Sequence, residues 1–237
     1  MSGTLYGVGL GPGDPELMTL KAVRLISKAR VIAYPALAGS DSFARSIAAE
    51  ILPVNVEEIR VDIPMTPARA PAQRAYDAGA VRIADRLTGG QDVVFLCEGD
   101  PLFYGSFMYM NARLCGRFPV QTVPGVTSVT AGAAAVGQPL SARNEVLTII
   151  PGPLDEAEME ARILGADAMV IMKVGRHLAK IRAVLDRLGL LGRAHYVERA
   201  TLGTERVMPL TELSEPAPYF SMILLTKGDD PWLKTRL

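Results

Sequence analysis

Two glycine-rich turns hold the residues whose types and spacing favour ligand chemistry. They are Gly7-Val-Gly-Leu-Gly-Pro-Gly-Asp14 and Glu98-Gly-Asp-Pro-Leu-Phe-Tyr-Gly105. Each turn follows a short apolar run and precedes a helical pattern, which is typical of a strand end where glycine lets the backbone come close to a bound molecule. The carboxylates of the second turn could accept hydrogen bonds from a ribose diol or lie near a cationic ligand. We therefore predict a nucleoside-like ligand at these turns, although Gly-Asp-Pro also fits an ordinary turn.

A third motif, Pro124-Gly-Val-Thr-Ser128, opens another helical pattern. Its default interpretation is a helix cap at Thr127 or Ser128. The alternative is that Thr127 presents its hydroxyl and backbone N–H to the ligand. Met172 ends a later apolar run, where a methionine most often only fills the core.

Known nucleotide-binding fingerprints do not fit the first turn. The G-x-G-x-x-G pattern requires a third glycine where this chain has Pro12, Asp14 or Glu16, depending on the register. The phosphate-loop pattern fails as well, because Gly13 is not followed by lysine and serine or threonine. The sequence therefore supports neither an NAD site nor a phosphate cradle.

Composition and charge exclude several other classes. The 237 residues are 49% hydrophobic and 21% charged, with 25 basic and 25 acidic side chains, so no basic excess points to nucleic acid. Cys97, Cys115 and two histidines predict neither a disulfide framework nor a zinc site, and we expect no metal. No apolar run reaches the ~18 residues of a membrane span. Without a secretory leader, the expected location is the cytoplasm.

The elements that must position these turns alternate between short apolar runs and helical periodicity, which predicts an α/β fold with mostly parallel sheets. Asp14, Thr19 and Ser42 are the expected helix caps, and Gly89 ends a helix over 73–87. In the first half, strands are expected at 5–8, 31–34 (ended by Pro35), 93–97 and 120–123, helices at 42–52, 73–87 and 103–114, and a surface loop at 61–71.

The second half predicts a further lobe, so we expect domains at 1–118 and 119–237. Its helices are expected at 128–136, 154–164 and 178–188, and its strands at 146–150, 168–172, 195–198, 205–208 and 221–227. The last two strands, joined by a turn-rich loop, predict antiparallel pairing late in the chain.

The three ordered motifs resemble those of the tetrapyrrole methyltransferases, the class III S-adenosylmethionine-dependent methyltransferases. The match covers residues 8–22, Gly99-Asp-Pro101 and residues 124–128, and it extends over nearly the whole chain. The resemblance implies two α/β domains with mixed, mostly parallel sheets, a cofactor trough between them and a homodimer. It also implies cofactor contacts, which in the numbering of this chain are Pro12, Gly99, Asp100, Thr127, Ser128, Met172 and Ala200.

Within the family, residues 98–109 resemble the members that methylate carbon 20 of precorrin-2 in cobalamin biosynthesis. The expected partners are thus S-adenosyl-L-methionine, with S-adenosyl-L-homocysteine as product, and a tetrapyrrole. Asp14 and Glu98 are the candidate proton acceptors, since each lies at a glycine turn. One departure is Tyr34-Pro35, where members acting on uroporphyrinogen III carry Tyr-Asp.

Four alternative functions remain open. They are a carbon-20 methyltransferase of the cobalt-containing substrate, a carbon-17 or carbon-11 methyltransferase, a non-catalytic tetrapyrrole carrier and, weakened by the failed fingerprint, a nicotinamide oxidoreductase. Arginines should meet the substrate carboxylates because their geometry is bidentate. Arg24, Arg45, Arg143 and Arg176 are the candidates.

Overall fold

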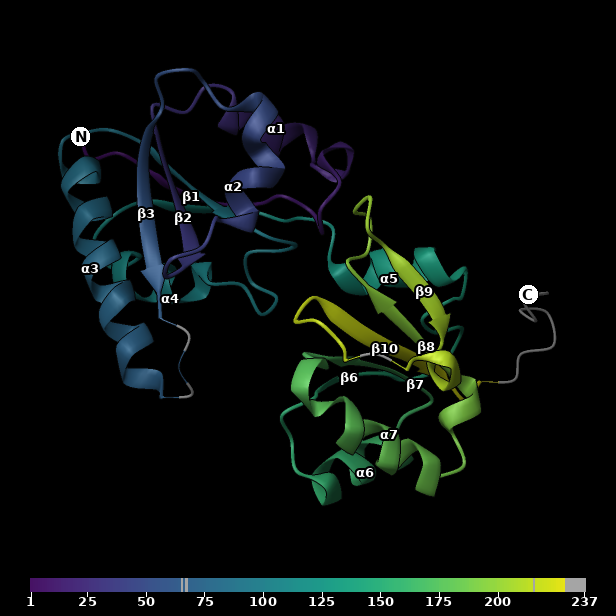
Figure 1. Ribbon diagram of the computed structural model, residues 1–237. Helices are drawn as coiled ribbons and strands as arrows, with labels where there is room; N and C mark the ends of the chain where they lie inside the picture. The colour runs from purple at the N-terminus through teal and green to yellow at the C-terminus, as the bar shows by residue number, and fades with distance from the viewer. Residues whose placement is uncertain (65, 67, 215, 229–237) are drawn as a thin grey trace. The chain divides into compact units, whose positions relative to one another are not determined.

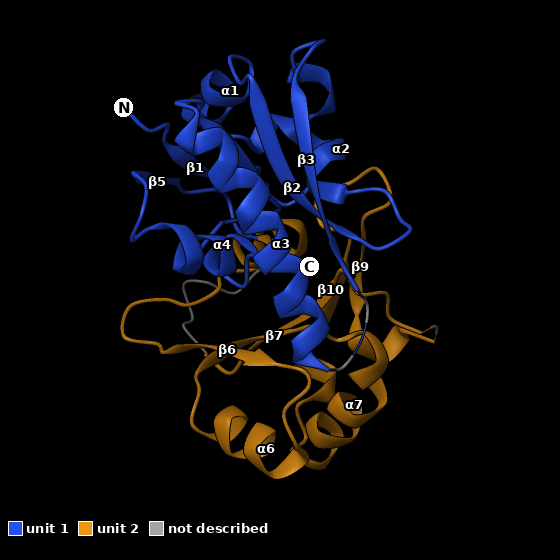
Figure 2. Cartoon of the chain, turned by 90° about the vertical axis from the view of Figure 1, so that its left-hand side faces the viewer, with its two compact units in different colours: residues 1–127 blue, residues 128–237 orange. Residues whose placement is uncertain are grey.

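The protein contains two five-stranded sheets, and continuous apolar runs form the buried strands of the first. The computed structural model describes residues 1–64, 66, 68–214 and 216–228. The chain divides into two compact units, residues 1–127 and 128–237 (Figure 2). This division falls later than the expected one after residue 118, because the strand Val120–Val123 pairs with the first strand of the chain. No helix in the described ranges is long and apolar enough to cross a membrane.

The sheet of unit 1 is parallel throughout and has the order β3-β2-β4-β1-β5. Its strands are β1 (Leu5–Gly9), β2 (Val31–Leu37), β3 (Glu57–Ile63), β4 (Val93–Cys97) and β5 (Val120–Val123). Its helices are α1 (Leu20–Ile26), α2 (Phe43–Ala48), α3 (Arg69–Thr88) and α4 (Phe107–Leu114), with 3-10 turns at Pro15–Leu17 and Ala49–Ile51.

Helices cover both faces of this sheet (Figure 1). One face packs against α3 and α4 through a buried cluster that includes Phe95 and Phe107. The other face packs against α1 and α2, with Val94 and Leu96 among the buried residues. Successive residues of β4 thus enter different cores, which explains why the whole strand is apolar.

The sheet of unit 2 has the order β6-β7-β10-β8-β9 and mixes directions. Its strands are β6 (Leu147–Pro151), β7 (Ala168–Met172), β8 (Ala194–Glu198), β9 (Arg206–Pro209) and β10 (Ser221–Thr226). Helices α6 (Glu156–Leu164) and α7 (Leu178–Arg187) pack on one face and α5 (Ser128–Val136) on the other (Figure 1). Short 3-10 turns lie at Gly175–His177, Leu191–Arg193 and Leu210–Glu212.

The expected α/β fold is confirmed. Within the described part of the chain, five of the eight strand pairings are parallel, namely β1–β4, β1–β5, β2–β3, β2–β4 and β6–β7. The helix caps at Asp14, Thr19 and Ser42 are also confirmed, since each side chain accepts a hydrogen bond from a backbone N–H of the following turn. Gly89 ends α3 as expected.

Several boundaries were wrong. Strand β2 continues through Pro35 to Leu37, because it pairs with β4 only at Ile32 and Ala33, and a proline beyond that segment breaks no bond to β4. The loop expected over 61–71 is instead the end of β3 and the start of α3, although residues 65 and 67 lie outside the described part.

Two other expectations required adjustment. Helix α4 begins at Phe107 rather than at residue 103, because the preceding residues form a tight turn after Asp100. The late strands pair antiparallel as expected. However, β9 and β10 each pair with β8 and not with one another.

Candidate active site

The unit 1 motifs follow three neighbouring strands of one parallel sheet. Strands β4, β1 and β5 are adjacent, so their carboxyl ends meet at the same edge, where α/β sheets bind ligands. The first and second turns are joined directly by two hydrogen bonds. The Gly99 N–H donates to the Gly11 carbonyl at 2.7 Å, and the Gly11 N–H donates to the Gly99 carbonyl at 3.3 Å.

Backbone contact among these turns explains several of the glycines. We call Gly9, Gly11, Gly99 and Gly125 the glycine cluster. A Cβ on Gly9 would lie 2.6 Å from the Gly125 nitrogen, and one on Gly125 would lie 2.1 Å from the Gly99 oxygen. The protein's own backbone therefore excludes side chains at Gly9 and Gly125. The sequence analysis had explained these glycines by the approach of a ligand.

Gly99 differs from its neighbours in the cluster. It adopts φ +61°, which disfavours other residues, and the nearest atom to an added Cβ would be the Val126 oxygen at 3.9 Å. The space beside this α-carbon is open. Gly99 is thus the cluster member at which another molecule can approach the backbone.

Asp100 connects the second motif to the third. Its Oδ2 accepts a hydrogen bond from the Gly125 N–H at 3.0 Å, and its Oδ1 accepts one from the Leu102 N–H at 2.8 Å. Bonds from N–H groups to a carboxylate are stronger than those between neutral groups. The carboxylate therefore holds the two turns together, while contact between Asp100 and a cofactor remains a prediction.

The two candidate proton acceptors lie in different environments. Burial raises the pKa of the Glu98 carboxyl, and hydrogen bonds from the N–H groups of Glu98 itself and Ala44 offset part of this rise. A raised pKa makes a carboxylate a better proton acceptor than an ordinary carboxylate. Asp14 instead caps the Pro15–Leu17 turn, where its Oδ1 accepts a hydrogen bond from the Glu16 N–H at 2.8 Å.

Among the candidate arginines, Arg45 is engaged by a carboxylate of the fold. The Arg45 guanidinium binds the Glu58 carboxylate through two hydrogen bonds of 2.7 Å, and the Tyr34 hydroxyl donates to the same carboxylate at 2.6 Å. The Arg45 guanidinium lowers the pKa of Glu58. Tyr34 therefore takes part in a hydrogen-bonded link between β2, β3 and α2. This is the position at which the sequence departs from the uroporphyrinogen pattern.

In unit 2, Met172 and Ala200 lie at one edge of the sheet. Met172 ends β7, and Ala200 follows β8; both strands run antiparallel to β10, which lies between them. Lys173 has φ +58°, and a Cβ on Gly152 would lie 2.7 Å from the Lys173 carbonyl oxygen. Ser128 is the first residue of α5.

Left-handed backbone at non-glycine residues gathers beside the predicted contacts. Arg199 and Thr201, with φ +49° and +71°, flank Ala200, and Lys173 follows Met172. Tyr104, with φ +55°, follows the Gly99-Asp100 turn, and the remaining case in the described chain is Arg143. Such conformations cost about 1 kcal/mol or more each and are concentrated at functional sites in proteins.

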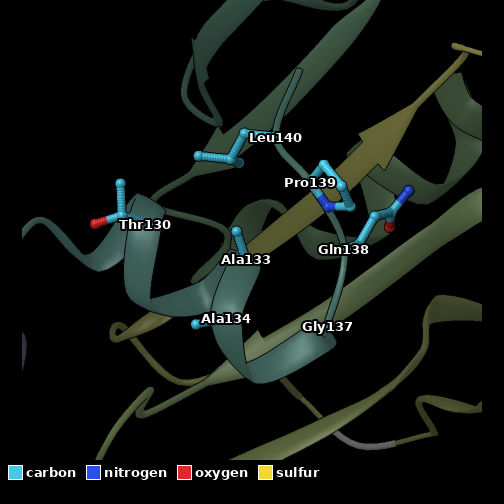
Figure 3. A pocket seen from close by; sticks show the side chains of 7 residues that line it. All are labelled: Thr130, Ala133, Ala134, Gly137, Gln138, Pro139 and Leu140. Atoms are coloured by element: carbon cyan, nitrogen blue, oxygen red, sulfur yellow. The ribbon is translucent and has the colours of Figure 1, made fainter. Parts of the chain in front are cut away.

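Unit 2 also contains a hollow. It has a volume of about 400 Å³ and is formed by α5 and the residues after it (Figure 3). Its lining is Thr130, Ala133, Ala134, Gly137, Gln138, Pro139 and Leu140. The lining contains none of the predicted contacts. Over the described residues, no three His, Cys, Asp or Glu side chains are grouped so as to hold a metal ion.

Comparison with known proteins decides the family. The family described as Tetrapyrrole (Corrin/Porphyrin) Methylases matches residues 4–216. The chain belongs to this family. The resemblance drawn from the three motifs is thereby confirmed.

Two curated relatives of this tetrapyrrole methylase are informative. The "Precorrin-2 C(20)-methyltransferase" of a Sinorhizobium species is 41% identical over 237 residues, which covers 96% of this chain and 97% of the relative. The "Cobalamin biosynthesis protein CobIJ" of Mycobacterium tuberculosis (strain H37Rv) is 45% identical over 236 residues. That alignment covers 95% of this chain but 46% of the relative, so the chain spans about half of the mycobacterial protein.

A solved structure shares the fold. The uroporphyrin-III C-methyltransferase of Thermus thermophilus, complexed with S-adenosyl homocysteine, has a TM-score of 0.67 and is 28% identical. The superposition covers 95% of this tetrapyrrole methylase and 92% of the other chain.

Sequence reasoning missed a buried polar pair beside Ala200. The Tyr196 hydroxyl donates to Glu198 Oε2 at 2.6 Å, and an Arg206 nitrogen lies 3.5 Å from Glu198 Oε1. Tyr196 and Glu198 are 0% and 4% exposed, and burial, followed by the bond to Glu198, raises the pKa of Tyr196. The alternation of Ala194, Tyr196 and Glu198 places all three on one face of β8, the only signal that could have paired them.

Replacing Tyr196 with phenylalanine is expected to lower the free energy of unfolding of this methylase by about 1–3 kcal/mol, because a buried carboxylate oxygen loses its donor. Urea unfolding followed by circular dichroism at pH 7 measures the change. Tyr219→Phe is the control, since Tyr219 is 69% exposed. Equal stability of Tyr196→Phe and wild type would show that the hydrogen bond contributes nothing.

Proposed function

We propose that this chain transfers a methyl group from S-adenosyl-L-methionine to carbon 20 of precorrin-2, giving precorrin-3A in cobalamin biosynthesis. The observation that carries the proposal is the match, over nearly the full length of both proteins, to a relative that bears this activity in its name. The relative named for the cobalt-containing substrate is less similar, at 32% identity, which favours the metal-free tetrapyrrole.

The residues present fit an adenosyl cofactor. The open side of Gly99 leaves its backbone accessible, and the glycine cluster fixes the position of this turn. A relative of the same fold is complexed with S-adenosyl homocysteine. We propose Pro12, Gly99, Asp100 and Thr127 as the unit 1 contacts, and Ser128, Met172 and Ala200 as those of unit 2.

Bound S-adenosylmethionine supplies a methyl group that its sulfonium has already activated, so the protein has little bond chemistry to assist. Its residues must hold the donor and the electron-rich tetrapyrrole carbon in line, and such positioning supplies ~7–11 kcal/mol of rate enhancement. Glu98 then accepts the proton that leaves the methylated carbon, a role for which its raised pKa is suited. Arginines bind the substrate carboxylates at the rim of the ring.

Incubation with precorrin-2 and a ¹³C-methyl donor tests the activity. We expect the label at carbon 20, located by NMR of the isolated product. Label at carbon 11 or 17 would point to another methyltransferase of the pathway, and no label would favour a tetrapyrrole carrier. Parallel incubation with the cobalt complex of the same substrate determines whether the metal-free form is preferred.

We further infer that the enzyme works in the cytoplasm and that it forms the homodimer implied by the family resemblance. Analytical ultracentrifugation of the purified chain measures the assembly state. A sedimentation mass of twice the 25.4 kDa chain supports a dimer.

Asp100→Ala is expected to weaken S-adenosylhomocysteine binding on the order of 10-fold or more, because two backbone N–H groups lose a charged acceptor and the turns they fix can move. Isothermal titration calorimetry measures the dissociation constant. Asp100→Asn keeps one acceptor oxygen and should lie between the wild type and Asp100→Ala. Wild-type affinity in Asp100→Ala would mean that this turn has no role in cofactor binding.

A further inference from the structure

The turn after Asp100 displays apolar side chains to solvent. Leu102 is 53% exposed and Tyr104 is 43% exposed, and the Phe103 ring contacts the Tyr104 ring edge-on at 5.0 Å. We call Leu102, Phe103 and Tyr104 the apolar turn. It begins two residues after Asp100, at the carboxyl end of β4.

Hydrogen bonds and close packing hold this turn in one shape. The Leu102 N–H donates to Asp100 Oδ1 at 2.8 Å, and the Phe103 N–H donates to the Asp100 carbonyl at 3.3 Å. A Cβ on Gly105 would lie 2.6 Å from the Pro101 oxygen, so the end of the turn folds back closely on its start. The exposed side chains are therefore presented by a backbone of fixed shape.

Tyr104 carries a conformational cost within this turn. Its φ of +55° is the left-handed region, which costs a non-glycine residue about 1 kcal/mol or more and which glycine adopts freely. Tyr104 is not buried in the core, so a molecule outside the fold can contact its exposed surface.

We propose that the apolar turn packs against the face of the tetrapyrrole substrate, with Tyr104 as a specificity-determining residue; this inference rests on the proposed function. A tetrapyrrole is a large ring system with an apolar face and carboxylates at its rim, so its face matches an exposed leucine and tyrosine. The adjacent Gly99 and Asp100 are the proposed cofactor contacts, and a turn that leaves this point can reach the second reactant. The adenosyl group is smaller and more polar, so it matches such a surface less well.

Two substitutions of Tyr104 separate its ring from its backbone. Tyr104→Ala removes the ring and keeps the left-handed strain, whereas Tyr104→Gly removes both. We expect KM for precorrin-2 to rise about 10-fold in each variant, the equivalent of one lost aromatic contact. We expect kcat to stay within about 3-fold of wild type and the dissociation constant of S-adenosylhomocysteine to remain unchanged. Tyr104→Phe, which keeps the ring, should retain the wild-type KM.

Thermal melting of the same variants reports the strain. Tyr104→Gly should melt ~2–4 °C above Tyr104→Ala, because glycine relieves the left-handed backbone. Tyr219→Ala is the matched control, since Tyr219 is another exposed tyrosine with an edge-on phenylalanine neighbour, at 5.2 Å. This control should leave KM unchanged.

Four results would overturn the inference: an unchanged KM in both Tyr104 variants, an equal rise in Tyr219→Ala, a parallel loss of S-adenosylhomocysteine affinity, or Tyr104→Gly melting below Tyr104→Ala. The proposed function is checked separately by the wild type. A wild-type enzyme that neither binds S-adenosylhomocysteine nor methylates precorrin-2 would refute that function, and this inference with it.

Discussion

Gly125→Ala is expected to lower the free energy of unfolding by about 3 kcal/mol and to reduce S-adenosylhomocysteine affinity more than 10-fold. The new Cβ would lie 2.1 Å from the Gly99 oxygen and 2.9 Å from the Gly9 α-carbon. Both neighbours are backbone atoms, which cannot rotate away as the end of a side chain can. The third turn must therefore move away from the other two, which disturbs the Asp100–Gly125 hydrogen bond.

Gly116→Ala provides the matched control for this experiment. Gly116 is exposed, and a Cβ on it would have no atom within 4 Å. The free energy of unfolding of Gly116→Ala should stay within about 0.5 kcal/mol of wild type, as for most surface substitutions. Urea unfolding and calorimetric titration are measured on both variants. If Gly125→Ala behaves like Gly116→Ala, the backbones of the glycine cluster cannot lie in contact with one another.

Glu98→Gln is expected to reduce kcat for methyl transfer by about 10²–10⁴-fold, the usual contribution of a general base. Glutamine keeps the shape of the side chain and a hydrogen-bond acceptor for the Ala44 N–H, so S-adenosylhomocysteine binding should change little. A radiolabelled methyl-transfer assay measures kcat, and calorimetry measures binding. Asp14→Asn is the comparison for the second candidate. A large loss of kcat in Asp14→Asn alone would assign the proton acceptor to Asp14.

The pH dependence of stability gives an independent test of the environment of Glu98. Its pKa is raised in the folded state, so the folded protein holds this proton more tightly than the unfolded chain does. The stability contributed by the neutral carboxyl is fully present below the unfolded pKa of about 4.3 and is lost as pH rises through the folded value. Glu98→Gln cannot ionise. Its melting temperature relative to wild type should therefore increase from pH 4 to pH 7, and a constant difference would contradict a raised pKa of Glu98 in the folded state.

Much of the fold was predictable because its elements carry strong local signals. Residues 128–136 and 168–172 were predicted with the bounds that α5 and β7 have in the structure. Strand β3 was missed, although Ile59, Val61 and Ile63 alternate with charged residues, the usual pattern of a half-buried strand. It borders β2 alone and carries charges towards solvent, so its composition resembled a loop.

The site was predictable at the level of motifs and not at the level of contacts. Glycine spacing indicated which turns matter, but it could not show that Gly9 and Gly125 make room for each other rather than for a ligand. Similarly, Asp100 and Gly125 are 25 positions apart, and their hydrogen bond depends on β1 lying between β4 and β5. The engagement of Arg45 by Glu58 depends equally on strand order. Tertiary contacts of this kind have no local pattern.

The position of β1 between β4 and β5 has a consequence for biosynthesis of the protein on the ribosome. Leu5 pairs with Val93 on one side and Val120 on the other, so the first strand translated has no partner until two much later strands have emerged. The nascent chain can build the β2–β3 pair early, but its leading segment stays unpaired through most of the translation of unit 1. The three glycine-rich turns can come together only after residue 125 has left the exit tunnel, which makes the candidate site one of the last features of this unit to form.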